Sequence, residues 1–291
     1  MDFSFSEDQV AIRELAYQIF TDRSTDAFQL EFSRTDQAYD DSLWTTLAEQ
    51  GLLGIGIPEH CGGAGLGLIE TCLVLEEQGR RVAPVPLFSS LVLGAMPIIE
   101  FGTEAQQQQY LSPLAAGELK LTAAISEIAM PAAVQQSVSA TKSDNGWTLT
   151  GSLDCVQDGA VANFILVPAT DASGNSSIFI IDSQAPGVSV QAQEISLLGP
   201  WSAALSLSDV TVNADALLGA EGQAPAIIHW LEQYANVGQC AMQTGICEEA
   251  MRRTATYTSE REQFGVPIGS FQALAMRMAD SYIDVEAMRS T

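Results

Sequence analysis

The most informative stretch of this 291-residue chain is Tyr257-Thr258-Ser259-Glu260-Arg261-Glu262-Gln263-Phe264-Gly265-Val266-Pro267-Ile268-Gly269-Ser270-Phe271-Gln272. It separates two segments of helical periodicity, one from about 225 to 258 and one that begins near Phe271. The second segment is still helical at Thr291, where the sequence ends. We therefore expect a helical bundle whose other helices either follow Thr291 or come from another chain.

The first of these segments is unusually long and carries small residues on one face. At 1.5 Å per residue it would extend roughly 50 Å, and a helix of that length needs neighbouring helices to cover it. Gly238, Ala241 and Gly245 recur three and four residues apart. This spacing places them on one face and predicts close approach of a neighbouring backbone.

Upstream of the bundle, the periodicity divides the chain into two further parts. Residues 1–116 have helical patterns, the first of them opened by a capping box of Ser6 and Gln9. From 117 to 223 the period changes to two, with buried-strand signals such as 164–167. We predict an α+β multidomain protein: an N-terminal helical domain (1–116), a small β-barrel or sandwich (117–223) and the start of a C-terminal helical bundle (224–291).

The charge balance limits the ligands and partners of the chain. Its 36 acidic and 12 basic side chains give a net charge of −24. This excess argues against nucleic acid and anionic membrane surfaces, so any polyanionic ligand must meet a few well-placed arginines. His60 and His229 are the only histidines, which argues against a metal site.

Compartment signals favour the cytoplasm. The N-terminus lacks the basic and apolar segments of a signal peptide, and the five cysteines contain no C-x-x-C pattern. The uncharged run 82–99 is interrupted by three prolines, so we expect buried core there and no membrane span.

The stretch from Tyr257 to Gln272 resembles the signature of the acyl-CoA dehydrogenase family. Five further stretches are similar to the family's sequence pattern. They are Leu53 to Glu59 with Gly62-Gly63-Ala64-Gly65, Glu77-Gln78-Gly79-Arg80, Phe101 to Gln106, Asn145 to Gly151 and Asp209 to Gly219. The resemblance covers the whole chain in order. It implies an FAD flavoprotein with an N-terminal helical domain, a middle β domain and a C-terminal four-helix bundle.

The resemblance also implies a reaction. Family members convert an acyl-CoA thioester to the enoyl-CoA: a carboxylate base removes the α-proton while the β-hydride passes to the flavin. The electrons usually continue to an electron-transfer flavoprotein. The family forms oligomers, so we expect a dimer of dimers, made of one or of two kinds of subunit.

Three residues of the signature match the family's contacts to FAD across the dimer. Arg261 and Gln272 stand where family members contact the diphosphate and adenosine portion, and Phe264 stands beside the adenine. A guanidinium suits this role because its fork meets phosphate oxygens bidentately. The alternative is a surface arginine paired with Glu260 or Glu262 and a phenylalanine that packs the turn.

At the flavin ring the sequence departs from the family's pattern. Ser126-Glu127 keeps the start of the T-E-P-x-A-G-S-D stretch, but the rest of 126–133 differs. The W-I-T-N-G element is Cys155-Val156-Gln157-Asp158-Gly159, so Cys155 replaces the ring-stacking tryptophan and Gln157 the flavin-bonding threonine. Ser126, Glu127 and Gln157 are the candidate flavin contacts that remain.

The catalytic base is not identified by the sequence. In the family it stands either between the last two helices, which would fall beyond Thr291, or early in the first bundle helix, where this chain has Ala235. Glu232 is the nearest carboxylate and a candidate; its alternative is a solvated helix residue.

Three hypotheses follow from these residues. The chain is an FAD-dependent acyl-CoA dehydrogenase whose base lies beyond Thr291, or a non-catalytic or FAD-sharing subunit of a heteromeric one, as in steroid side-chain degradation. The third hypothesis is a binding or assembly protein that keeps only the fold. The departures at 126–133 and 155–159 favour the last two, whereas the signature at 261–272 favours the first two.

Overall fold

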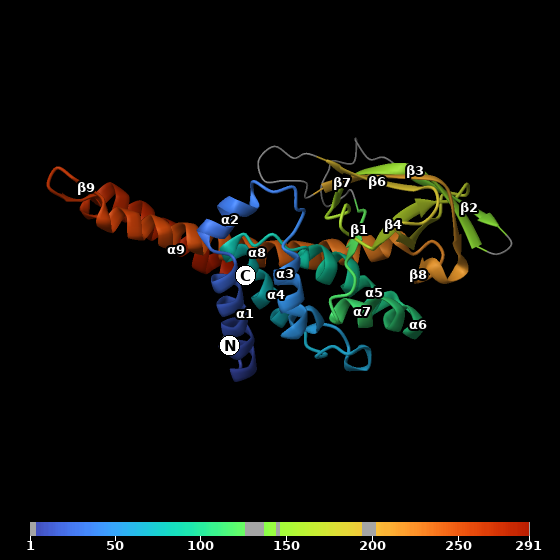
Figure 1. The fold of residues 1–291 in the computed structure, drawn as a ribbon, viewed down its shortest axis with the longest axis horizontal. Helices are drawn as coiled ribbons and strands as arrows, with labels where there is room; N and C mark the ends of the chain where they lie inside the picture. Colours follow the sequence, from blue (N-terminus) through green and yellow to red (C-terminus); the bar gives the residue numbers. More distant parts are fainter. Residues whose placement is uncertain (1–3, 126–136, 144–145, 194–201, 291) are drawn as a thin grey trace. The chain divides into compact units, whose positions relative to one another are not determined.

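The computed structural model describes residues 4–125, 137–143, 146–193 and 202–290. The chain forms two compact units. We call Met1–Gln29, Ile69–Ala83 and Val237–Thr291 the helical unit, and Leu30–Leu68 with Pro84–Asn236 the sheet unit. Helices in the N-terminal and C-terminal parts of the chain with a mixed β sheet between them in sequence confirm the predicted α+β architecture (Figure 1).

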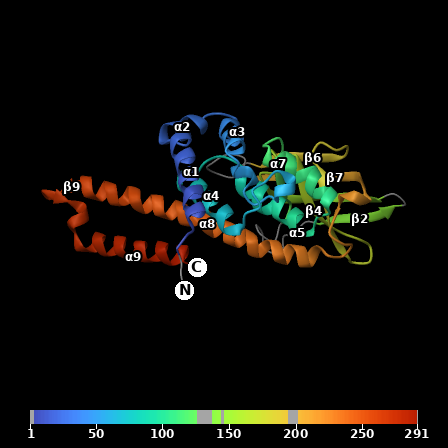
Figure 2. The same ribbon diagram turned by 90° about the horizontal axis from the view of Figure 1, so that it is seen from below.

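The helical unit is built from segments far apart in the sequence. It contains α1 (Glu7–Arg23), most of α4 (Leu68–Arg81), the C-terminal part of α8 (Ala224–Glu260), the hairpin β9 (Glu262–Gln263) and β10 (Val266–Pro267), the short η8 (Ile268–Ser270) and α9 (Gln272–Arg289). The predicted capping box opens α1: Gln9 N donates to Ser6 Oγ, and Ser6 N donates to Gln9 Oε1. After the hairpin, α9 runs back alongside α8 (Figure 2).

Helices α4 and α8 approach so closely that only glycine fits at two positions. A Cβ on Gly79 would lie 2.1 Å from the backbone oxygen of Met242, and a Cβ on Gly245 would lie 1.9 Å from that of Glu76. Real Cβ atoms do not approach oxygen so closely, so these glycines set the distance between the two helices. The close approach predicted at Gly245 is confirmed.

A buried ion-pair network joins α4, α8 and α9. Arg80 donates to Glu77 at 2.7 Å, to Glu248 at 2.7 Å and to Glu76 at 3.2 Å. Arg289 of α9 pairs with Glu76 at 3.0 Å and also with Glu248. Burial raises the pKa of Glu77, against the effect of Arg80. For Glu248, burial is outweighed by Arg80 and Arg289, which lower its pKa. Ion pairs between arginines and glutamates therefore connect the three helices.

The sheet unit combines short helices with one mixed sheet. Its helical segments are α3 (Asp41–Glu49), η1 (Leu52–Gly54), η2 (Glu59–Cys61), η3 (Phe88–Ala95), α5 (Met96–Phe101), α6 (Glu104–Gln106), η4 (Gln107–Leu111), α7 (Ser112–Ala115) and η7 (Ala214–Ala216), and α2 (Asp26–Phe32) enters it from the helical unit. All of residues 88–95 are buried. No helix within the described ranges is long and apolar enough to span a membrane.

The strands form one sheet that stays open. They are β1 (Leu121–Ala123), β2 (Val138–Ser143), β3 (Gly146–Gln157), β4 (Phe164–Thr170), β5 (Ser176–Asp182), β6 (Val188–Gln193), β7 (Ser202–Asn213) and β8 (Leu217–Leu218). Their order is β6-β7-β3-β2-β4-β5-β8, with β1 beside β4. Among the strands that the structure describes, β6 and β8 do not pair. The barrel alternative of the predicted barrel or sandwich is therefore wrong, and the strands form an open mixed sheet. Because β8 has only two residues, it offers little edge for closure.

Candidate functional site

The hairpin between α8 and α9 carries an exposed aromatic residue in a strained conformation. Phe264 and Gly265 form its turn with φ angles of 56° and 81°, and Gln263 pairs with Val266. Two consecutive left-handed residues are typical of a type I′ turn, where glycine and asparagine are favoured over phenylalanine. Phe264 is 94% exposed, and its ring forms an edge-to-face contact with the ring of Phe271, with ring centroids 6.3 Å apart. Backbone strain that no burial of the side chain offsets is typical of functional sites.

The base of the same hairpin fixes the backbone of Arg261 and leaves its guanidinium unpaired. Arg261 N donates to Tyr257 O at 2.9 Å, and Arg261 O accepts from Ile268 N at 2.8 Å. The side chain is exposed and forms no ion pair within the part of the chain that the structure describes. The alternative of a surface pair with Glu260 or Glu262 is therefore wrong for the described residues. Gln272, the first residue of α9, is also exposed.

These three side chains suit one end of a dinucleotide. An unpaired guanidinium can bind a diphosphate bidentately, and an exposed ring can stack on an adenine. Their backbones are held by the hairpin and the start of α9. The hairpin therefore presents side chains whose chemistry suits a diphosphate and an adenine.

The element that would face the flavin ring has an irregular backbone and no aromatic side chain. Cys155 adopts a left-handed φ of 60° inside β3, where the pairing with β7 shifts register. Its N–H donates to Gln193 Oε1 at 3.0 Å, and the carbonyl of Gln157 accepts from Thr122 Oγ1 at 2.7 Å. A thiol is too small to stack on a tricyclic ring, so this end fits a flavin less well than the hairpin fits the diphosphate. Ser126 and Glu127 lie outside the described residues.

Sequence reasoning missed the carboxyl that follows this element. Asp158 has a left-handed φ of 51° and accepts a hydrogen bond of 2.6 Å from the Ser89 hydroxyl of η3. Burial raises the pKa of Asp158 to about 6, although the Ser89 bond lowers it in part. The signal in the sequence was the aspartate itself, since the family's pattern has asparagine at this position.

We expect Asp158→Asn to stabilise the protein at pH 7.5 and to have no such effect below pH 4. The pKa of Asp158 is raised from 3.8 to about 6 on folding, so stability falls as the pH rises between these values and the loss persists above pH 6. At about 1.4 kcal/mol for each pKa unit, the ionised carboxyl costs up to about 3 kcal/mol. Asparagine carries no charge and tolerates the left-handed backbone. Urea unfolding midpoints at the two pH values measure the difference.

Asp209 provides the matched control for this substitution. It has the same φ of 51° but an exposed side chain that accepts from Thr150 Oγ1. Asp209→Asn should therefore shift the midpoint equally at both pH values. An equal shift for Asp158→Asn would show that the backbone, and not the buried carboxyl, is responsible.

The described residues do not identify the catalytic base. Ala235 is fully buried on α8. Glu232 lies one turn earlier with a side chain that is 36% exposed, and its carboxylate is 3.8 Å from Nδ1 of the exposed His229. Thr291 lies outside the described residues. Glu232 therefore has the surroundings of a solvated helix residue.

Comparison with known proteins places the chain in a class. Residues 6–118 match the model of the acyl-CoA dehydrogenase N-terminal domain, and residues 233–291 match that of the acyl-CoA dehydrogenase C-terminal domain. FadE27, an acyl-CoA dehydrogenase of Mycobacterium tuberculosis, is 35% identical over 291 residues, which are 100% of this chain and 75% of that protein. The chain belongs to the acyl-CoA dehydrogenase family, whose members are oxidoreductases.

Two solved structures are similar over nearly the whole chain. The ChsE4-ChsE5 complex from Mycobacterium tuberculosis contains a chain that is 34% identical with a TM-score of 0.89, and the match covers 98% of this chain and 76% of that one. A variant of the steroid ACAD Tcur3481-Tcur3483 contains a chain that is 38% identical with a TM-score of 0.87, covering 98% and 75%. The fold seen here is thus that of acyl-CoA dehydrogenases.

Proposed function

We propose that the chain is one subunit of a heteromeric acyl-CoA dehydrogenase that converts an acyl-CoA thioester to the enoyl-CoA. In this proposal its hairpin completes the FAD site of a partner subunit. The observation that carries the proposal is the hairpin itself, where Arg261 has no ion-pair partner among the described residues and Phe264 is strained and 94% exposed. Among the described residues, Arg261 has no ion-pair partner and the Phe264 ring has a single aromatic contact, to Phe271. Both side chains suit a dinucleotide brought by another chain.

The flavin-ring element supports the two-subunit form. Cys155 and Gln157 offer neither the aromatic face nor the hydroxyl of the family's pattern, while the diphosphate grip of the same chain is complete. A subunit with only one good end of the FAD site is useful where its partner supplies the other end. The names of the ChsE4-ChsE5 complex and of the steroid ACAD favour the same arrangement, and they favour a steroid-derived acyl-CoA as substrate.

The exposed surface of α9 supports an oligomer. Val285 is the one buried residue among those the structure describes in this helix, whereas Met276, Tyr282 and Ile283 are 59%, 55% and 63% exposed. Large apolar side chains on one helix usually mark a contact surface. A dimer of dimers would cover them.

The roles of this chain's residues follow from their chemistry. Arg261 would bind the diphosphate of FAD as a fork, Phe264 would stack on its adenine, and the Gln272 amide would hydrogen-bond the adenosine portion. Bound FAD supplies the acceptor for the hydride that leaves the β-carbon. We expect the base that removes the α-proton to come from the partner subunit, an electron-transfer flavoprotein to take the electrons, and the assembly to work in the cytoplasm.

The test is to purify the chain alone and together with a second acyl-CoA dehydrogenase-like subunit encoded beside it, and to compare flavin absorbance per protein. We expect a yellow complex and a colourless single chain. A yellow, active single chain would instead support a dehydrogenase that needs no second subunit. Absence of flavin from both preparations would support a protein that keeps only the fold.

A further inference from the structure

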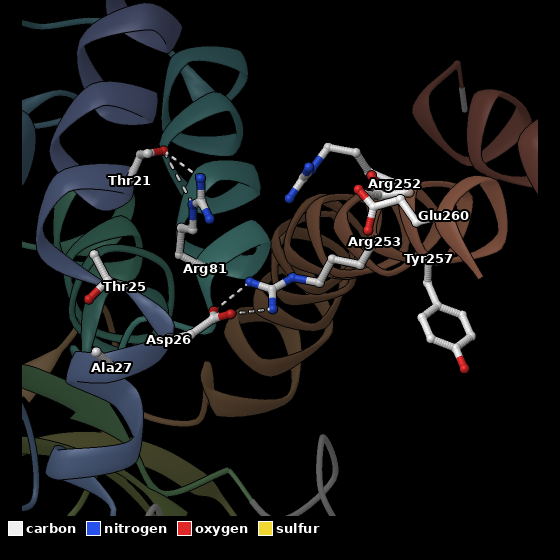
Figure 3. A pocket seen from close by; sticks show the side chains of 10 residues that line it. Thr21, Thr25, Asp26, Ala27, Arg81, Arg252, Arg253, Tyr257 and Glu260 are labelled. Atoms are coloured by element: carbon white, nitrogen blue, oxygen red, sulfur yellow. Dashed lines mark hydrogen bonds and ion pairs between the residues drawn. The ribbon is translucent and has the colours of Figure 1, made fainter. Parts of the chain in front are cut away.

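The helical unit contains an open cleft of about 670 Å³ in which three arginines meet. Its lining residues come from the end of α1 and the start of α2, from α4 and from α8, and include Thr21, Asp26, Arg81, Arg252, Arg253 and Glu260. In Figure 3 the guanidinium groups of Arg81, Arg252 and Arg253 point toward the same space, while the Tyr257 ring points away. In a chain of net charge −24, this gathering of cations is a local exception.

The carboxylate of Glu249, which lies beside these arginines, already accepts three hydrogen bonds from them. Glu249 is 5% exposed and accepts bonds of 2.7 Å from Nε and Nη2 of Arg252 and from Nε of Arg253. Nη1 of Arg81 lies 3.8 Å away. The bonds from Arg252 and Arg253 lower the pKa of Glu249 to about 2, so it stays ionised at any physiological pH. One negative charge is thus shared among three positive ones.

The remaining contacts leave donors unused. Asp26 pairs with Arg253 at 2.6 and 2.8 Å, and Arg81 donates through Nε and Nη2 to the neutral hydroxyl of Thr21. A guanidinium has five N–H donors. Within the described residues, Nη1 of Arg252 and of Arg81 therefore have N–H groups to spare. The three arginines contact two carboxylates, and the carboxylate of Glu260 also lines the cleft. Of the lining threonines, Thr256 already donates to the carbonyl of Arg252, whereas the hydroxyls of Thr21 and Thr25 accept hydrogen bonds and keep an O–H that can donate.

We propose that this cleft binds an anionic group of the phosphate type. Arg252 is the residue that would make the main contact, because its side chain is 59% exposed, it lines the cleft, and only its Nε and Nη2 are bonded to Glu249 among the described residues. The overall negative charge of the chain repels anions at a distance, so recognition rests on short-range guanidinium and hydroxyl donors. The proposal does not depend on the FAD-sharing role of the hairpin.

The test is thermal melting of the protein in inorganic phosphate and in chloride at equal ionic strength. We expect a saturable rise of the melting temperature in phosphate only. Arg252→Gln should weaken the apparent phosphate affinity about tenfold, since one charge-assisted contact is worth roughly that factor. Arg252→Lys keeps the positive charge beside Glu249 but loses the bidentate guanidinium, so it should weaken the apparent phosphate affinity less than Arg252→Gln does. If Arg252→Gln does not fold, the phosphate affinity of Arg252→Lys serves as the test.

Two arginines outside the cleft serve as controls. Arg277 on α9 and Arg261 in the hairpin are both exposed, and neither forms an ion pair in the described ranges. Arg277→Gln should keep the phosphate effect. Arg261→Gln tells the cleft apart from the hairpin, to which the proposed function assigns a diphosphate: a shift that depends on the cleft survives this substitution. ADP as a second probe distinguishes the sources: an Arg252-dependent gain over phosphate indicates a nucleotide, and equal affinity indicates free phosphate. No phosphate-specific shift, or a shift that Arg261→Gln abolishes and Arg252→Gln does not, would overturn the proposal.

Discussion

Replacing Gly245 with alanine is expected to destabilise the protein by about 3 kcal/mol, with a fall of roughly 6 to 12 °C in melting temperature. The new Cβ would stand 1.9 Å from the backbone oxygen of Glu76, and this oxygen cannot move without its helix. Helix propensity alone predicts the opposite sign, since alanine is favoured over glycine by about 1 kcal/mol in a helix interior. The direction of the change therefore tests whether α4 and α8 touch at this point. Thermal and urea unfolding of the purified variant measure it.

Two further variants separate this steric effect from a general change in the helix. Gly79→Ala changes the same helix contact from the side of α4, where the new Cβ would lie 2.1 Å from Met242 O. A destabilisation of similar size is therefore expected. Gln239→Ala lies on an exposed position of α8 and should stay within about 0.5 kcal/mol of the parent protein. A Gly245→Ala variant as stable as the parent would show that the two helices are farther apart than described.

Local signals in the sequence predicted most of the helices and strands. Ser6 and Gln9 marked the start of α1 because a capping box needs only residues three apart. By contrast, nothing marked the bounds of α2 within the region predicted to be helical, because none of its seven residues is buried and no apolar stripe distinguishes it. The open edge of the sheet was also missed, since closure of a sheet depends on pairing between distant strands and not on the period of any one of them.

The candidate site was predictable where the chain itself carries the pattern. The signature from Tyr257 to Gln272 named Arg261 and Phe264, but the exposure of both side chains and the left-handed turn required coordinates. The bond between Ser89 and Asp158 joins residues 69 positions apart. The arginine cleft draws on three segments, and no residue pattern along the chain brings Asp26 beside Arg253. Such contacts arise from tertiary packing alone.

Replacing Arg261 with alanine is expected to lower the flavin affinity of the assembled oligomer roughly 10- to 100-fold and to leave the stability of the chain nearly unchanged. A charge-assisted contact to a phosphate contributes about 1.5 to 3 kcal/mol, and about 1.4 kcal/mol is a factor of ten. The guanidinium is exposed and unpaired among the described residues, so its removal breaks no bond that holds the fold. The flavin-to-protein absorbance ratio after gel filtration measures the loss, and thermal melting of the single chain measures the stability.

The comparison with Arg277→Ala makes this result specific to the hairpin. Both substitutions remove one positive charge from an exposed, unpaired arginine of a chain whose net charge is −24, so they weaken any long-range attraction for a dinucleotide equally. Only Arg261 lies at the base of the hairpin that presents Phe264, so only its loss should release flavin. Arg261→Lys should retain an intermediate amount, since an ammonium keeps the charge without the bidentate fork. Equal flavin content in the Arg261→Ala and parent oligomers would rule out a shared site at this hairpin, and the strained turn at Phe264 would then need another explanation.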